Sequence, residues 1–436
     1  MTTAELSKVL FAPTTFLLYV GAMLAYFWTM AQRIDRAPAV EGQGAAGSVH
    51  VPGRRGLWLA TGLASLGLAA HLGHLVTRSM ASGGRVPWGN MFEYSSVMGF
   101  GVVLAGLVIF QWRMRRPEVV GFLLLGAILT MGGALLVWSE PGPLMPILNS
   151  EWLKIHVFAI MLAATIFTVG FVFNGLYLLR ETAERRVAES NQARAVGSTV
   201  GAAYSPAGTL DEDADRDSSA DAVPERTTLP DAVEGVDLRG GVSDPTEELD
   251  EGAYGRALKA AIDPRRLFAG TWLATAGLSW VFWAAEGWHR ESWSGLGEFV
   301  TLVNWEGFAR FFTVNTVLGV AAVIAWVLLA RLPAATTLDS LAYRTIAFGF
   351  PIWTFAVISG AIWAEQSWGR YWGWDPKETS AFLTWLAYAA YLHARATRGL
   401  RGRGAAKLGI LAFAVLMFTY FVVNLVVTGL HSYAGL

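Results

Sequence analysis

The chain contains no cysteine among its 436 residues, and only 15% of its residues are charged. Disulfides, thiolate metal ligands and cysteine nucleophiles are therefore excluded, and any thiol chemistry must use the cysteines of another molecule. The formal net charge of -1 offers no basic excess, so we expect no nucleic-acid partner. An iron site would depend on the seven histidines or on weaker donors such as Met and Tyr.

The low charge accompanies long apolar runs. Hydrophobic residues make up 54% of the chain, and they fall in runs of roughly 18 to 25 residues, each long enough to cross about 30 Å of hydrocarbon. Because an open-ended segment in lipid satisfies its backbone only as a helix, we predict an all-α polytopic membrane protein with about ten transmembrane helices. The first run lacks a basic start and a cleavage site, so we expect a retained helix. The expected spans are 10–31, 57–77, 94–112, 118–138, 153–179, 266–285, 310–331, 345–364, 378–395 and 407–428.

Basic residues predict the orientation in the bacterial plasma membrane. Short loops that would face inward hold most of the Arg and Lys, among them Arg113, Arg115, Arg116 and Arg395. Cytoplasmic loops carry such an excess, so we expect both termini outside.

Composition divides the chain into four parts. We expect five transmembrane helices in 1–180, an acidic disordered inner loop in 181–264, an extra helix pair in 265–335, and a core with the last three helices in 336–436. The loop is rich in Asp, Glu, Gly and Ser and cannot bury enough apolar surface to fold alone. A solvated linker is the favoured interpretation, with a regulatory docking segment as the alternative.

The run from 368 to 378 reads Trp-Gly-Arg-Tyr-Trp-Gly-Trp-Asp-Pro-Lys-Glu, between two apolar segments. An aromatic shelf at the membrane surface suits a large flat ligand, and a porphyrin is flat with two carboxylates on one edge. A plain interfacial aromatic belt is the alternative. The candidate porphyrin-binding residues are the indoles of Trp368, Trp372 and Trp374, with Arg370 and Lys377 for the propionates.

Three histidines are candidate iron ligands. His156 and His431 lie at the predicted outer ends of their spans, on the same side as the aromatic run, so two imidazoles could approach a porphyrin from opposite faces. His393 lies near the inner end of its span and could take one axial position, leaving the other to a partner protein. We expect His71 and His74 to be polar groups near the interface.

Three further polar residues flank predicted helix starts. Asp375 precedes Pro376 and is expected to cap the next helix. Asn90 and Glu93 belong to the outer segment Pro-Trp-Gly-Asn-Met-Phe-Glu at 87–93. For Glu93 two interpretations stay open, a helix cap or a clamp on an imidazole or on a propionate-binding arginine.

The aromatic run resembles the WWD motif of haem-handling proteins, and its context resembles the CcsA/ResC family of System II cytochrome c biogenesis. Shorter matching pieces occur in the family's order: Pro87-Trp-Gly-Asn90-Met-Phe-Glu93, Ile155-His156-Val157, Tyr391-Leu-His393-Ala-Arg395 and Gly429-Leu-His431-Ser-Tyr-Ala. The helices expected at 266–285 and 310–331 look like an insertion relative to that pattern.

The resemblance implies an outer haem b platform at the WWD run, with ligation by His156 and His431. It implies a second haem site in the bilayer at His393, completed by a membrane partner of the CcsB/ResB type. Haem would then be joined by two thioether bonds to the Cys-x-x-Cys-His motif of apocytochrome c, with a thiol-reducing protein as a further partner. The chain would be part of a holocytochrome c synthase complex.

Three alternatives remain open at this point. A haem exporter or chaperone of the CcmC type also carries a WWD run. A membrane electron-transfer cytochrome of the b type would require bis-histidine pairs at both faces. A solute transporter would bind no haem.

Overall fold

The computed structural model describes residues 1–32, 53–136, 138–143, 148–203, 251–276, 305–397, 399–424, 427 and 429–430. Within these residues all regular structure is helical, which confirms the predicted all-α class. The elements are α1 (Thr3–Val9), a π-helical turn (Leu10–Thr15), α2 (Phe16–Gln32), α3 (Gly53–Ala81), α4 (Met91–Ala105) with its π-helical continuation (Gly106–Arg113), a 3-10 turn (Pro117–Val119), α5 (Val120–Leu136), α6 (Glu151–Ala203), α7 (Glu251–Ala260), α10 (Trp305–Val327), a second 3-10 turn (Leu329–Arg331), α11 (Ala335–Trp368), α12 (Pro376–Thr397), α13 (Arg403–Phe418) and a final π-helical turn (Thr419–Val423).

Seven helices in the described part of the chain are long and apolar enough to cross a membrane, which confirms a multi-pass membrane protein. The other predicted spans fall on α10, on α12 and on a segment that lies partly outside the described residues, so the total of about ten stays a prediction. The seven candidate spans are Thr3–Gln32, Arg55–Ala81, Met91–Arg113, Pro117–Leu135, Glu151–Ala193, Ala335–Trp368 and Arg403–Val423.

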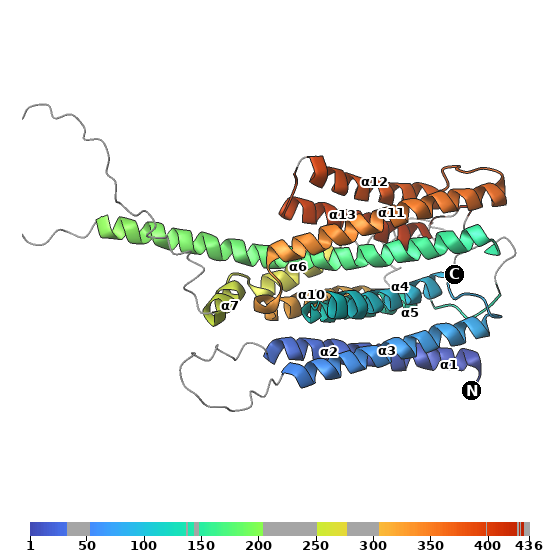
Figure 1. Cartoon of the computed structure of the whole chain (residues 1–436), viewed down its shortest axis with the longest axis horizontal. Coiled ribbons are helices and arrows are strands. Elements are labelled where there is room, and N and C mark those ends of the chain that lie inside the picture. Colours follow the sequence, from blue (N-terminus) through green and yellow to red (C-terminus); the bar gives the residue numbers. More distant parts are fainter. Residues whose placement is uncertain are drawn as a thin grey trace, which may run out of the picture.

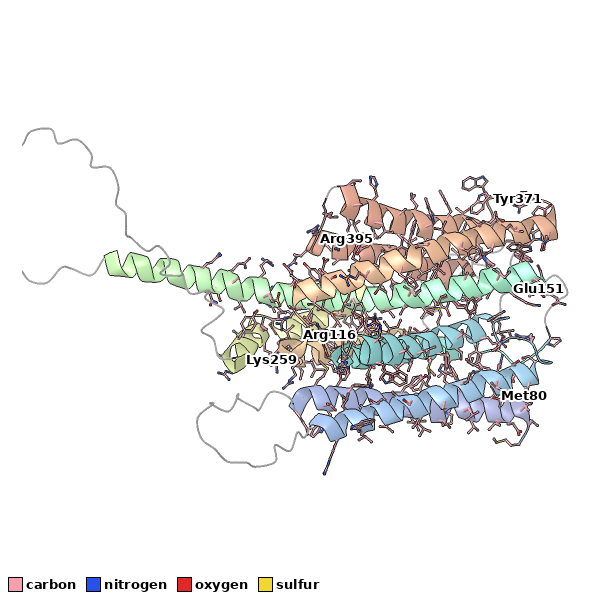
Figure 2. The ribbon with its side chains drawn as sticks, in the orientation of Figure 1. Met80, Arg116, Glu151, Lys259, Tyr371 and Arg395 are labelled. Atoms are coloured by element: carbon pink, nitrogen blue, oxygen red, sulfur yellow. The ribbon has the colours of Figure 1, made fainter. Side chains whose placement is uncertain are left out.

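The helices lie roughly parallel in three layers (Figure 1). α1 to α3 form one layer, α4, α5 and α10 the middle one, and α6 packs along α11 in the third layer together with α12 and α13. Figure 2 places Met80, Glu151 and Tyr371 at one end of the bundle and Lys259 and Arg395 toward the other. The aromatic run and the start of α6 therefore share one end, as the predicted topology requires.

Close packing between α6 and α11 depends on a small residue. A Cβ added at Gly349 would lie 2.9 Å from side-chain atoms of both Ile166 and Phe167. Because lipid tails are as apolar as leucine, membrane helices associate through such close backbone approach rather than through the hydrophobic effect. This contact brings the outer turn of α6, which carries His156, against α11.

The expected linker boundary at 181 is wrong, because α6 continues to Ala203 and projects beyond the bundle (Figure 1). Charged pairs one turn apart stabilise the continuation: Arg180 lies 2.6 Å from Glu184, and Arg185 lies 2.6 Å from Glu189. α7 likewise falls within the expected linker and packs on the core through Leu258. Most of the acidic sequence, 204–250, lies outside the described residues.

Candidate functional site

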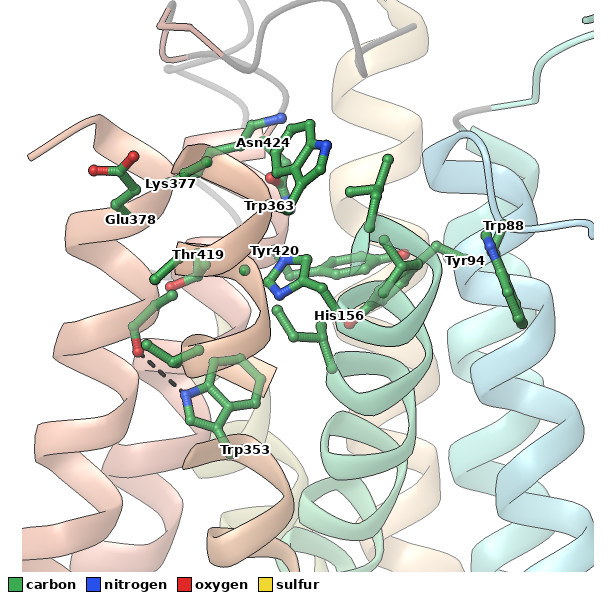
Figure 3. A pocket seen from close by; sticks show the side chains of 18 of the residues that line it. Trp88, Tyr94, His156, Trp353, Trp363, Lys377, Glu378, Thr419, Tyr420 and Asn424 are labelled. Carbon is green, nitrogen blue, oxygen red and sulfur yellow. Dashed lines mark hydrogen bonds between the residues drawn. The ribbon is translucent and has the colours of Figure 1, made fainter. Parts of the chain in front are cut away.

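A cavity of about 220 Å³ lies at the end of the bundle that carries Tyr371. Its walls come from the loop before α4, from α6, α11, α12 and from the end of α13, so residues distant in sequence meet there (Figure 3). The lining is mainly aromatic and apolar, with a few polar groups. Its aromatic and polar members are Trp88, Asn90, Tyr94, His156, Trp353, Trp363, Tyr371, Trp372, Lys377, Glu378, Thr419, Tyr420 and Asn424.

His156 is held in this cavity in a defined protonation pattern. Its Nδ1 lies 2.7 Å from the carbonyl oxygen of Ala356, and a carbonyl only accepts, so Nδ1 carries the proton and donates it. The lone pair is then on Nε2, as in histidines that ligate metals while the other ring nitrogen donates to a carbonyl. A Cβ at Gly360 would lie 2.5 Å from Nδ1, so α11 both binds the ring and leaves room for it.

The aromatic run contributes two of its rings to the cavity wall, Tyr371 and Trp372. Trp368 lies instead at the end of α11, where its ring packs 4.9 Å from that of Trp363, a lining residue. Trp374 is 68% exposed and has a φ of 59°, a left-handed conformation that is uncommon outside glycine. Its ring lies 5.9 Å from Trp372, so it extends the aromatic surface outside the cavity.

The two cations predicted for propionates are separated. Lys377 lines the cavity, and burial lowers the pKa of its ammonium to about 8 although the nearby Asp375 carboxylate acts in the opposite direction. Arg370 lies 3.5 Å from the Glu378 carboxylate. The backbone N–H of Gly373 also donates to Glu378, at 2.7 Å, so Glu378 fixes the loop and draws Arg370 onto it.

Asp375 is a helix cap, as predicted, because its Oδ1 accepts the backbone N–H of Lys377 at 3.1 Å. Its Oδ2 accepts the N–H of Leu430 at 2.7 Å. One carboxylate therefore ties the residue before His431 to the start of α12. His431 itself lies outside the described residues.

Glu93 pairs with two arginines, and the cap of α4 is Asn90. The Asn90 side chain accepts the N–H of Glu93 at 2.9 Å and also lines the cavity. The Glu93 side chain is 1% exposed and binds Arg78 at 2.9 Å and Arg85 at 2.6 Å. It does not line the cavity. This buried triad fixes the loop that presents Trp88.

The remaining candidate histidines lie away from the cavity lining. His393 is exposed on α12, near the end that carries Arg395. His71 and His74, predicted to be polar groups near the interface, are both fully buried inside the protein. His71 lies 3.2 Å from the Tyr19 hydroxyl and 2.9 Å from Ser96, and His74 lies 3.0 Å from the Ser7 carbonyl.

Several cavity residues were not predicted from the sequence. Trp353 and Trp363 come from α11, Tyr94 from α4 and Tyr420 from the last π-helical turn, and no local motif marks them. A sequence signal existed only for Trp88, which belongs to the Pro-Trp-Gly-Asn segment before α4.

Comparison with known proteins shows which proteins this chain resembles. Residues 303–431 match the family model described as Cytochrome C assembly protein, a range that contains α10, the aromatic run and His431. The cytochrome c biogenesis protein CcsA of Synechococcus sp. (strain JA-2-3B'a(2-13)) is 28% identical over 384 residues, 85% of each chain. CcsA of Microcystis aeruginosa is 55% identical over 103 residues, 24% of this chain and 31% of that protein.

The chain is similar to CcsA cytochrome c biogenesis proteins along most of its length. The predicted resemblance is thereby confirmed, and a role in cytochrome c maturation follows, in the bacterial plasma membrane. α10, interpreted above as part of an insertion, falls inside the family match.

Proposed function

We propose that this chain is the haem-handling subunit of a System II cytochrome c synthase. It would bring haem b to the cavity around His156, where haem is attached to the Cys-x-x-Cys-His motif of apocytochrome c. The observation that carries the proposal is the Nδ1–Ala356 hydrogen bond, which places the lone pair of His156 on Nε2 in an aromatic cavity.

The lining residues fit a haem group chemically. Aromatic faces such as Trp372 pack on a macrocycle, Lys377 meets a propionate, and His156 supplies one axial nitrogen. The cavity of about 220 Å³ is smaller than the roughly 300–1,000 Å³ of sites that enclose a ligand. Part of the macrocycle would therefore lie against Tyr371 and Trp374, which are 61% and 68% exposed.

His431 is the proposed second axial ligand. The bond from the Leu430 N–H to Asp375 supports this assignment, because it anchors the neighbouring residue at the start of α12. Haem, when bound, supplies the vinyl groups that accept the two cysteine thiols. The task of the protein is then to orient the macrocycle and the substrate peptide, which is how positioning accelerates a bimolecular step.

The absence of cysteine and the exposed face of α12 both point to partner proteins. It has no cysteine, so the thiols come from apocytochrome c and are kept reduced by a separate thiol-reducing protein. His393 is exposed on α12, where Leu383 and Leu386 are also exposed, at 46% and 48%. We propose that a membrane partner of the CcsB/ResB type covers this face and completes a haem site at His393. Both termini would face outside.

The test is a visible spectrum of the purified chain together with its membrane partner. His156→Gly should lose most of the Soret absorbance per folded protein and regain it with added imidazole, because the ring leaves a space beside the cavity. His74→Gly is the matched control and should keep its Soret band.

An unchanged Soret band in His156→Gly would overturn the assignment. A reporter peptide containing Cys-x-x-Cys-His distinguishes the synthase from the alternatives. Covalent haem on the peptide supports the synthase, whereas transfer of noncovalent haem to a carrier protein would support an exporter or chaperone.

A further inference from the structure

A second hollow lies far from the haem cavity, between α2, α3 and α10. It has a volume of about 620 Å³ and an apolar lining that includes Phe27 and Trp28 of α2, Leu59 of α3, and Ile324 and Val327 of α10. Trp28, Leu59 and Val327 are 64%, 59% and 43% exposed. These residues belong to the halves of α2 and α10 that lead toward Lys259, the end opposite Tyr371 (Figure 2). This end is the predicted cytoplasmic side.

Cationic residues lie next to residues that line the inner end of this groove. Arg331, just after α10, donates through Nη2 to the carbonyl oxygen of Ala31 at 2.5 Å, and Ala31 lines the groove. Arg55 immediately precedes Gly56, another lining residue, and is exposed. The guanidinium of Arg331 therefore contacts the backbone of a residue that lines the groove.

Lys259 of α7 is part of the same basic group. Its carbonyl oxygen accepts the indole N–H of Trp326 at 3.0 Å, which docks α7 on α10. Burial, and secondly the charge of Arg331, lower the pKa of the Lys259 ammonium, so the two cations are close enough to repel each other. An anion between them would relieve this repulsion. Asp263, which follows Lys259 by four residues, has its carboxylate 3.6 Å from the guanidinium of Arg266.

We propose that an anionic phospholipid of the inner leaflet occupies this groove, with an acyl chain along Trp28 and Leu59 and its phosphate beside Arg331 and Lys259. A groove of hydrocarbon character ending in cations from separate helices is complementary to such a lipid in both parts. A zwitterionic lipid would match only the apolar part. The lipid would join the α2–α3 pair to α10 and is independent of the haem proposal.

The experiment is lipid binding by the full chain, measured by native mass spectrometry after delipidation and exchange into phosphatidylglycerol or phosphatidylcholine. We expect retained phosphatidylglycerol and little phosphatidylcholine. Arg331→Gln and Lys259→Gln should each weaken the phosphatidylglycerol adduct about fivefold, since one cation near the surface contributes about 1 kcal/mol. Ala31→Phe, which fills the groove, should weaken it without removing a charge.

Arg266→Gln is the matched control, because Arg266 is a cation of the same side with a 91% exposed side chain paired to Asp263. Equal binding of the two lipids, or equal loss in Arg331→Gln and Arg266→Gln, would overturn the proposal. Each variant is first checked for a monodisperse elution profile, and Lys259→Gln provides the answer if Arg331→Gln does not fold. The haem spectrum should be unchanged in all four variants, which separates this inference from the proposed function.

Discussion

Two histidines of this chain have a similar backbone contact and opposite surroundings. Nδ1 of His156 lies 2.7 Å from the carbonyl oxygen of Ala356, and Nδ1 of His74 lies 3.0 Å from both the carbonyl and the hydroxyl oxygen of Ser7. His156 lines a cavity. His74 is fully buried, with Phe11 and Phe92 at ring distances of 4.7 and 5.8 Å. A carbonyl beside Nδ1 is therefore common to both rings, and under the proposed function it is access to a cavity that distinguishes the imidazole that binds iron.

The same contrast extends to the regions around the two rings. The N-terminal helices around His74 are held together by hydrogen bonds and by the ion pairs of Glu93 with Arg78 and Arg85. The region around His156 is left partly open, with Tyr371 and Trp374 exposed beside it. We expect mutations in the first region to change stability, and mutations in the second to change haem binding at constant stability.

The largest expected effect is that of Glu93→Gln. Removing the carboxylate leaves the buried guanidinium of Arg78 and the largely buried one of Arg85 without their counter-ion, and breaking such a buried arrangement costs about 3–5 kcal/mol. We expect a markedly lower midpoint of thermal unfolding in detergent. Haem content should fall only in proportion to the loss of folded protein.

The control for this prediction is Glu140→Gln. Glu140 pairs with Lys8 at 2.7 Å, but its side chain is 65% exposed. Water screens such a pair, so the unfolding midpoint should not change measurably. If Glu93→Gln lost haem at an unchanged unfolding midpoint, Glu93 would belong to the binding region and the contrast between the two regions would be wrong.

Gly360→Ala tests the open region. The new Cβ would lie 2.5 Å from Nδ1 and 2.6 Å from Cε1 of His156, so the ring must move and the Ala356 hydrogen bond must lengthen or break. A displacement that costs about 1.4 kcal/mol weakens binding about tenfold. We expect haem affinity to fall by about this factor in a titration with haem, while the unfolding midpoint is kept.

Gly175→Ala is the matched control on α6, the helix that carries His156. A Cβ there meets no atom within 4 Å, and alanine favours a helix over glycine by roughly 0.5–1 kcal/mol. It should keep full haem affinity. Equal behaviour of the two variants would show that Gly360 does not position the histidine.

The sequence predicted the helical class, the similarity to CcsA proteins and part of the cavity lining because these depend on local signals. Apolar runs report membrane helices directly, and the cap at Asp375 follows from its position before Pro376. The aromatic run also identified Trp372 and Lys377, which line the cavity. Its other indoles could not be assigned, because Trp374 turns outward through a left-handed backbone that no local pattern indicates.

The rest depends on contacts between helices. Trp353 and Trp363 resemble ordinary membrane-helix residues until α11 is packed against α6 and α12. Gly360 has a role only because it packs against His156, which lies 204 residues earlier in the chain (360 minus 156). The extension of α6 beyond residue 181 was missed for another reason. Its charges resemble a solvated linker in composition, whereas their spacing at i and i+4 stabilises a helix.

The smallest expected effect is the pH dependence given by Lys377. Because burial lowers the pKa of this ammonium to about 8, the side chain is charged below that pH and loses its charge as the pH rises through it. Affinity for an anionic porphyrin should therefore fall between pH 7 and 9 by up to about fivefold, the effect of one partly screened ion pair. In Lys377→Arg the side chain should stay charged, so the affinity should no longer depend on pH. In Lys377→Gln the affinity should be low and should not change with pH. A wild-type profile that falls only near the ordinary lysine value of 10.5 would mean that Lys377 is solvated in the protein. The open region would then be wetter than its aromatic lining indicates.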